Sequence, residues 1–268
     1  MKKKKNIKII VKKYVTNSIS RYLENKGKPD TFNPLELIFP KERYTHSIMQ
    51  GMMTSIGTNL WENLAIELAA NNNFEILNKN DFNSSVPVIP DEIYNRITKF
   101  NKSRINTSNS LDILRKELKL EIEKLKINKN SLKYEKIPKG EGVDLWFKKN
   151  DTEYMFETKT VQINSGSGTD FSFKLCKWNF YRLVQEDNSN LNLITAVAFP
   201  YDPDGGDFYK KRRGRISPLI PGEDALVGNE FWDLLTGEKN TLKKIVQSFK
   251  EVGKSGVLDK YKDKFYKS

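Results

Sequence analysis

Apolar residues recur at two different spacings along the chain, and the first half follows the helical one. Apolar side chains repeating every three or four residues between Ile10 and Leu23 predict a helix within residues 1 to about 28, ended by Gly27 and Pro29. A loop is expected over 31–40, and one long helix over 44–70. The buried stripe of that long helix is expected at Ile48, Met52, Ile56, Leu60, Leu64 and Leu68.

The middle of the chain predicts a loop followed by a helical insertion. Asparagine, serine and proline residues between 71 and 92 are typical of turns, with one short strand at 74–77. Leucines and isoleucines at helical spacing predict a helix over 111–127. We expect one domain spanning residues 1–268, with residues 93–130 as a helical insertion within it.

After Pro138 the pattern changes to that of strands. Residues 143–147 and 153–163 are rich in aromatic and β-branched side chains, and 149–151 are typical of a turn, so a hairpin is predicted. Further elements are expected as a helix at 173–185, a buried strand at 191–199, and helices at 230–235 and 241–252. Strands and helices in this order predict an α/β fold.

Composition narrows the class of protein. Hydrophobic residues make up 37% of the chain, enough for a sizeable core, and no apolar run reaches the roughly 18 residues that a membrane span needs. The lysine-rich start lacks a following apolar stretch, so we expect no secretion signal. One cysteine, Cys176, and one histidine, His46, cannot build an internal disulfide or an ordinary zinc site. A cytoplasmic location fits.

The charge balance favours a polyanionic partner. Lys and Arg total 46 against 34 Asp and Glu, a formal net charge of +12 that attracts nucleic acid. The alternative is a solvated lysine surface in a chain that is generally rich in Lys, Asn and Ile.

Three charged residues on the predicted hairpin carry the candidate chemistry. Glu157 and Lys159 are two residues apart in a strand and therefore share one face, whereas Phe156 and Thr158 point to the other. A two-residue turn at Asn150-Asp151 sets Asp144 opposite Glu157. A turn centred on Asn150 alone sets it opposite Phe156, and a bulge alters either register.

Two carboxylates and a lysine in this arrangement suit phosphodiester hydrolysis. Asp144 and Glu157 are oxygen ligands for Mg²⁺, the backbone carbonyl of Thr158 can complete the inner shell, and Lys159 can orient the attacking water or stabilise charge. The competing interpretation is chance, because alternating Glu and Lys commonly decorate an exposed strand.

These residues resemble the PD-(D/E)xK nuclease superfamily, and more narrowly the TdeIII-like type II restriction endonucleases. The likeness rests on His46–Ser55 with Trp61-Glu62-Asn63, on Asp144–Phe147 with Glu157–Asn164, and on Gly228–Asp233. One departure is Val143, where the superfamily name has proline.

The resemblance implies a mixed central sheet between helices and Mg²⁺-dependent, sequence-specific cleavage of double-stranded DNA. It also implies a homodimer, a companion DNA methyltransferase and a short palindromic site, with GGNCC as the candidate sequence. A metal-binding glutamate on the first core helix corresponds best to Glu62, with Glu67 as competitor.

Further DNA contacts are expected beyond the hairpin. A basic run follows Pro203–Gly206 in an expected flexible loop after the last core strand, and consists of Lys210, Lys211, Arg212, Arg213 and Arg215. Gln162 and Asn164 are candidates for contacts to bases, and the run Ser165–Gly168 is interpreted as a flexible loop because it lacks the phosphate-loop ending.

Two rival functions stay open on the sequence. One is a structure-selective or repair nuclease of the same superfamily, and the other is a non-catalytic basic nucleic-acid-binding protein.

Overall fold

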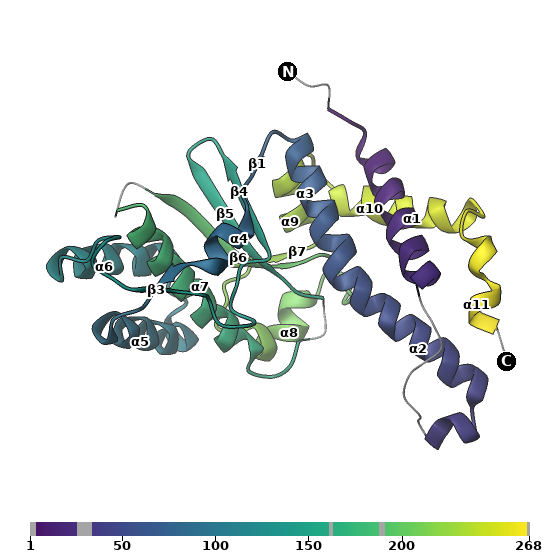
Figure 1. Cartoon of the computed structure of the whole chain (residues 1–268), viewed down its shortest axis with the longest axis horizontal. Coiled ribbons are helices and arrows are strands. Elements are labelled where there is room, and N and C mark those ends of the chain that lie inside the picture. The colour runs from purple at the N-terminus through teal and green to yellow at the C-terminus, as the bar shows by residue number, and fades with distance from the viewer. Residues whose placement is uncertain (1–3, 26–33, 161–162, 188–190, 267–268) are drawn as a thin grey trace. The chain divides into compact units, whose positions relative to one another are not determined.

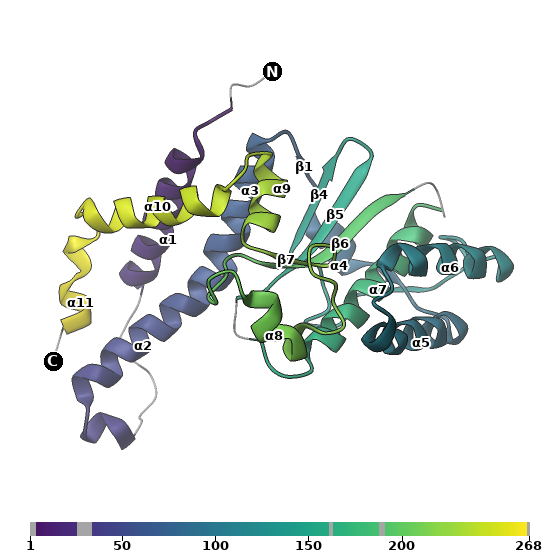
Figure 2. The same ribbon diagram turned by 180° about the vertical axis from the view of Figure 1, so that it is seen from behind.

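The computed structural model describes residues 4–25, 34–160, 163–187 and 191–266. The chain forms two compact units, the first made of Met1–Asn72 and Leu235–Ser268 and the second of Asn73–Leu234. Figure 1 and Figure 2 show their elements from opposite sides. The single-domain organisation of residues 1–268, with 93–130 inserted in it, stays a prediction.

The first unit is helical. Its elements are α1 (Ile7–Asn25), η1 (Pro34–Leu37), α2 (Pro40–Ser55), η2 (Ile56–Leu60), α3 (Trp61–Asn71), α10 (Thr241–Lys254), η3 (Asp259–Tyr261) and α11 (Asp263–Tyr266). Helix α1 packs against α10 and α3 and buries Val11 and Val15. The helices predicted near the N-terminus and over 241–252 are thereby confirmed.

The long helix predicted over 44–70 is present, with one irregular turn. Helices α2 and α3 are joined through η2, a π turn in which the amide of Trp61 donates to the carbonyl of Ile56, five residues earlier. Of the expected stripe, Ile48, Leu60, Leu64 and Leu68 are buried. A π turn adds a residue to the helical repeat and rotates the faces on either side of it, which accounts for the partial exposure of Met52 and Ile56.

The second unit is built on a mixed five-stranded sheet, as predicted. Its strands are β1 (Glu75–Ile76), β4 (Leu145–Lys149), β5 (Thr152–Thr158), β6 (Asn192–Phe199) and β7 (Ala225–Val227), in the order β1-β4-β5-β6-β7. The pairs β1–β4 and β4–β5 are antiparallel, whereas β5–β6 and β6–β7 are parallel. Two short strands, β2 (Val86–Pro87) and β3 (Tyr134–Glu135), form a separate ribbon.

Helices flank the sheet, which also agrees with the sequence. The remaining elements are α4 (Lys79–Ser84), α5 (Asp91–Thr107), α6 (Leu111–Lys124), α7 (Ser167–Gln185), α8 (Phe208–Ile216) and α9 (Asn229–Thr236). Helix α7 covers one face of the sheet, and α5 and α6 pack against α7 (Figure 1). The other face of β5 carries Tyr154 and Phe156, and the Phe156 ring meets that of Phe231 on α9 edge to face, with centroids 5.4 Å apart.

Several boundaries differ from the sequence prediction. Strand β5 ends at Thr158 rather than continuing to residue 163, and α4, β2 and β7 were not predicted. The run Ser165–Gly168 is not a loop throughout, because α7 begins at Ser167. Gly168 in its first turn admits the close approach of α8, because a Cβ there would clash with the backbone carbonyl of Ile216.

Among the described residues, no helix combines the length and the apolar character needed to cross a membrane.

Candidate active site

The predicted trio of Asp144, Glu157 and Lys159 lies at the open end of the β4–β5 hairpin. The turn consists of Asn150 and Asp151, and the ladder pairs Lys149 with Thr152 and Leu145 with Phe156. Extending that register by one residue sets Asp144 opposite Glu157. This is the register expected for a two-residue turn at Asn150-Asp151. The ladder is distorted at this point, since the Asp144 amide donates to the Phe156 carbonyl at 3.1 Å.

Asp144 is anchored to the end of the neighbouring strand. Its Oδ2 atom accepts hydrogen bonds from the backbone amide of Thr158 at 2.8 Å and from the Thr158 hydroxyl at 3.0 Å. The backbone just before it is held by Asn83 of α4, whose side-chain oxygen accepts from the Val143 amide at 2.9 Å and whose nitrogen donates to the Val143 carbonyl at 3.1 Å. Both ends of Asp144 are thus constrained.

Gly142 permits the Asn83 contact. A Cβ at this position would lie 2.8 Å from the Asn83 side-chain oxygen, closer than carbon and oxygen tolerate. The glycine-containing turn before Asp144 therefore has a packing reason in addition to its flexibility. Asn83 was missed by the sequence analysis, because a local pattern does not reveal a partner 60 residues away.

Glu157 lies between two lysines. Its carboxylate is 3% exposed, with Oε1 2.7 Å from the Lys159 ammonium and Oε2 2.6 Å from that of Lys174. Burial of a carboxylate is costly unless it is paired, and here the two ammonium groups provide both the charge and the hydrogen bonds. The structure therefore brings Glu157 and Lys159 together, as the strand pattern predicted.

Lys174 is the site residue that sequence reasoning overlooked. It lies on α7 and is 7% exposed, with its ammonium 5.7 Å from the centroid of the Trp178 ring. The available signal was a lysine four residues before a tryptophan in an otherwise aromatic helix, which places it on the face that packs on the sheet. Its partner could not be identified without the fold.

A second buried carboxylate on the same face of β5 provides a comparison. Glu153 is 6% exposed and accepts two hydrogen bonds from the Arg182 guanidinium of α7, at 2.9 and 3.1 Å, and one from the Trp146 indole at 3.1 Å. Glu153 lies far along the strand from Asp144, whereas Glu157 is beside it and is paired with the partly exposed Lys159. The position at the strand end distinguishes the candidate site from a structural ion pair.

The basic run was predicted in a flexible loop but forms a helix, α8. It was also expected after the last core strand, whereas β7 follows it in the chain. Helix α8 buries Phe208 and Ile216, eight residues apart, so the basic residues between them face outwards. Arg212 pairs with Asp204 at 2.8 Å. The exposed cations of α8 are Lys210, Lys211, Arg213 and Arg215.

Helix α8 and the trio lie near the same end of α7. Ile216 at the end of α8 touches Gly168 in the first turn of α7. Phe171 follows within the next turn, and its ring centroid is 5.6 Å from the Lys159 ammonium. A basic helix close to two paired carboxylates suits a phosphodiester substrate.

Comparison with known proteins shows the family of the chain. The family model described as type II restriction endonuclease, HinfI, matches residues 2–253. The chain belongs to the HinfI family of type II restriction endonucleases. It is also 27% identical over 127 residues to the type II restriction enzyme MjaII of Methanocaldococcus jannaschii, a stretch that covers 44% of this chain but only 34% of that relative.

The remaining predicted residues of this HinfI-family chain are not brought into the trio by any described contact. Asn164 is exposed before α7, and Gln162 lies outside the described residues. Glu62 is on α3 of the first unit and is partly exposed, and Glu67 on the same helix accepts a hydrogen bond from the Tyr14 hydroxyl at 3.2 Å. The roles assigned to these residues stay predictions.

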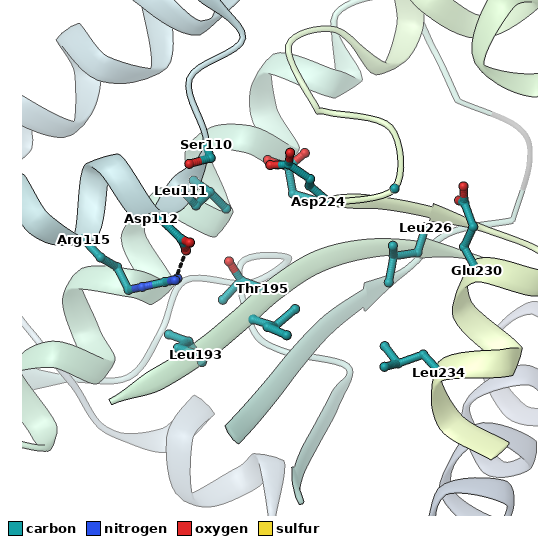
Figure 3. Close-up of a pocket in the computed structure, with 13 residues that line it drawn as sticks. Ser110, Leu111, Asp112, Arg115, Leu193, Thr195, Asp224, Leu226, Glu230 and Leu234 are labelled. Atoms are coloured by element: carbon teal, nitrogen blue, oxygen red, sulfur yellow. Dashed lines mark hydrogen bonds and ion pairs between the residues drawn. The ribbon is translucent and has the colours of Figure 1, made fainter. Parts of the chain in front are cut away.

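A separate cavity of about 500 Å³ is lined by residues that include Asp112, Arg115 and Asp224, but none of the trio (Figure 3). Its charged groups are largely occupied: Asp112 contacts Arg115, and Asp224 contacts the buried Arg104. Burial raises the pKa of Asp224 although Arg104 opposes the shift. Because Asp112 and Asp224 already pair with arginines, this cavity is a weaker candidate for chemistry than the hairpin end.

Proposed function

We propose that the protein is a Mg²⁺-dependent type II restriction endonuclease that hydrolyses both strands of DNA at a short specific sequence. The observation that carries the proposal is the ion pair between the buried Glu157 and Lys159, 2.7 Å apart at the open end of the hairpin. Asp144 lies at the same end, where its carboxylate accepts hydrogen bonds from Thr158, the residue between them. Family membership supports the same activity. The arrangement also supports assignment to the PD-(D/E)xK superfamily, with Val143 in the place of proline.

The donor set fits magnesium. Asp144 and Glu157 would hold the ion together with the backbone carbonyl of Thr158, and an all-oxygen set suits a hard cation. In the described part of the chain no group of three or more His, Cys, Asp or Glu side chains could hold a metal. Mg²⁺ does not require one, since it is usually bound by one or two carboxylates plus waters and substrate phosphates. The bound ion would supply Lewis-acid activation and charge neutralisation at the phosphate.

The lysines balance the buried charge and serve the substrate. Lys174 is deeply buried and holds Glu157 in place, whereas the Lys159 side chain is 39% exposed and can reach a phosphate or the attacking water. We assign Lys159 to orienting that water or stabilising the developing charge, and Lys174 to positioning Glu157. Lys159 is thus a catalytic residue and Lys174 a positioning residue.

The proposal extends to the partners. The exposed cations of α8 would contact DNA phosphates, Asn164 and Gln162 would contact bases, and Glu62 would assist metal binding. A homodimer matches a palindromic site, and a companion methyltransferase would protect host DNA. GGNCC is the candidate site that the TdeIII-like resemblance implies, and sequencing the ends of digested plasmid DNA tests it directly.

Substitutions at Asp144 and Lys159 test the chemistry. Asp144→Asn keeps an acceptor for the Thr158 amide and removes the negative charge, and Lys159→Gln removes an ammonium that is partly exposed. Each should lower the Mg²⁺-dependent cleavage rate by at least about 100-fold, while DNA binding is largely retained. Unchanged cutting by Asp144→Asn would refute the assignment. A non-catalytic DNA-binding protein predicts no cutting by the wild type at all.

Glu157 needs a control for stability. Removal of one partner from a buried ion pair destabilises a protein by roughly 3–5 kcal/mol, so Glu157→Gln could lose activity through unfolding alone. Glu153→Gln breaks the buried pair with Arg182 on the same strand face and is the matched control. We expect both variants to melt at lower temperature, and only Glu157→Gln to lose cleavage at a temperature where both remain folded.

The cleavage pattern distinguishes the enzyme from a structure-selective or repair nuclease. Discrete plasmid fragments with one common end sequence support the restriction enzyme. Cutting restricted to branched or damaged substrates would favour the rival.

A further inference from the structure

The positive charge of the chain is concentrated in the unit that does not carry the trio. The first unit contains 21 Lys and Arg against 10 Asp and Glu, a formal net charge of +11, whereas the second contains 25 against 24, a net charge of +1. The long-range attraction for a polyanion therefore originates almost entirely from the first unit. A surface in the first unit that can hold a polyanion would give this division a function.

A polar groove in the first unit offers such a surface. It has a volume of about 640 Å³ and lies between α1 and the α2–η2–α3 segment, elements that contact each other within this unit. One wall is a stripe of α1 with Lys13, Asn17 and Arg21, and the other is Ser55, Asn59 and Asn63 at four-residue spacing. Among the described residues that line the groove, none is acidic. The second wall crosses the η2 π turn, a feature often found at functional sites.

The lining is equipped with donors for an anion. Lys13 and Arg21 are exposed, and neither is ion-paired within the part of the chain that the structure describes. The Asn59 amide donates to the Ser55 hydroxyl at 3.4 Å, and the Asn63 amide donates to the Asn59 carbonyl at 2.5 Å. Each amide has two N–H groups, so each retains one donor for a ligand.

The shape decides what kind of contact the groove makes with DNA. Bases are read by elements that project into the grooves of the duplex, and a recess between two helices cannot do this. A recess can receive the convex sugar-phosphate backbone, for which Lys, Arg, Ser and Asn are the usual partners. We propose that this groove binds the phosphodiester backbone of one DNA strand without regard to sequence. The inference rests on the proposed function only in taking DNA as the ligand.

The test measures DNA binding without divalent metal, by fluorescence anisotropy over a range of salt concentrations. The double variant Lys13→Ala/Arg21→Ala should bind specific and unrelated duplexes more weakly to the same extent, by about fivefold per cation at 0.15 M salt. The slope of log K against log salt should become less steep by about two. Asn17→Ala should weaken binding with no change in slope, because a neutral donor releases no counterions.

Matched controls separate the groove from diffuse charge. Lys243→Ala/Lys250→Ala removes the same charge from exposed positions of α10 in the same unit, outside the groove. We expect this control to leave the salt slope nearly unchanged. An equal loss of slope in both double variants would overturn the proposal, as would DNA binding that neither Lys13→Ala/Arg21→Ala nor Asn17→Ala weakens. Circular dichroism melts confirm that the variants are folded.

The outcome is independent of cleavage. A wild type that binds DNA through the groove but never cuts it leaves this inference intact and refutes the proposed endonuclease. If the wild type cuts DNA and the groove variants bind DNA as tightly as the wild type, the endonuclease is supported and the groove proposal is refuted. Selective loss of sequence discrimination in the groove variants would indicate contacts to bases and would also contradict the proposal.

Discussion

At the scale of single residues, the reactivity of the Cys176 thiol tests whether the second unit, which holds the trio, is folded. Its side chain is fully buried on α7, and burial raises the pKa of the thiol to about 12. Since the thiolate is the reactive form, we expect no reaction with a thiol reagent at pH 8 in native buffer and rapid reaction in denaturant. Fast labelling of a protein with unchanged circular dichroism would contradict the prediction. The same assay checks whether Glu157→Gln and Glu153→Gln remain folded.

The residues of the site differ in how far the sequence could reveal them. Glu157 and Lys159 were predictable because the two-residue repeat of a strand puts them on one face. The place of Asp144 was left open between two turn registers, and the structure has the turn at Asn150 and Asp151. Lys174 and Asn83 were not predictable, because their roles depend on packing between elements distant in sequence. Local patterns identify the groups on a hairpin, whereas their supporting partners require the tertiary fold.

At the scale of elements, the contact between α1 and α10 should depend on pH. Glu251 of α10 accepts hydrogen bonds from Lys12, from Gln247 and from Lys8, and these contacts, with Lys12 the largest, lower its pKa to about 2 from an ordinary value of 4.5. A carboxyl with a depressed folded-state pKa contributes stability that is complete above the unfolded pKa and lost as pH falls through the folded one. The contribution should therefore disappear between about pH 4.5 and pH 2.

Thermal melts of wild type and Glu251→Gln test this dependence. The wild type should melt at higher temperature at pH 6, the difference should shrink at pH 3, and it should vanish near pH 2. Other carboxyls titrate in both proteins and cancel in the comparison. A difference that is constant from pH 6 to pH 2 would rule out the ion pairs as its source.

Elements were predictable where one face is clearly apolar. Helices α1 and α10 and strand β6 lie where the spacing of apolar residues predicted them, because their amphipathic or buried runs are long enough to show a period. Helix α8 was missed since only Phe208 and Ile216 are buried and the five cations between them obscure the helical repeat. Strand β5 was predicted too long because residues suited to a strand continue past Thr158. Its parallel partner β6 ends at Phe199, one residue beyond the partner of Thr158.

At the scale of the whole molecule, the mixed sheet flanked by helices was predictable, and the division of labour between two units was not. The net charge of +12 is a property of the full sequence, and its location in the first unit emerges only when residues 235–268 join the N-terminal helices. On our proposals the second unit carries the chemistry and the phosphate contacts of α8, and the first unit adds the long-range attraction for DNA. The consequence is kinetic and can be measured on the intact enzyme.

Added salt should weaken substrate binding and spare the chemical step. Two phosphate contacts in the groove predict about a tenfold rise in KM between 50 and 200 mM salt, and KM follows affinity when chemistry is slow relative to substrate release. The turnover number should change little, because Glu157 is shielded from solvent and its ion pairs are weakly screened. Lys13→Ala/Arg21→Ala should show a higher KM with a flatter salt dependence. A turnover number that falls steeply with salt at constant KM would mean that the charges of the first unit do not serve binding, and the separation of roles would be wrong.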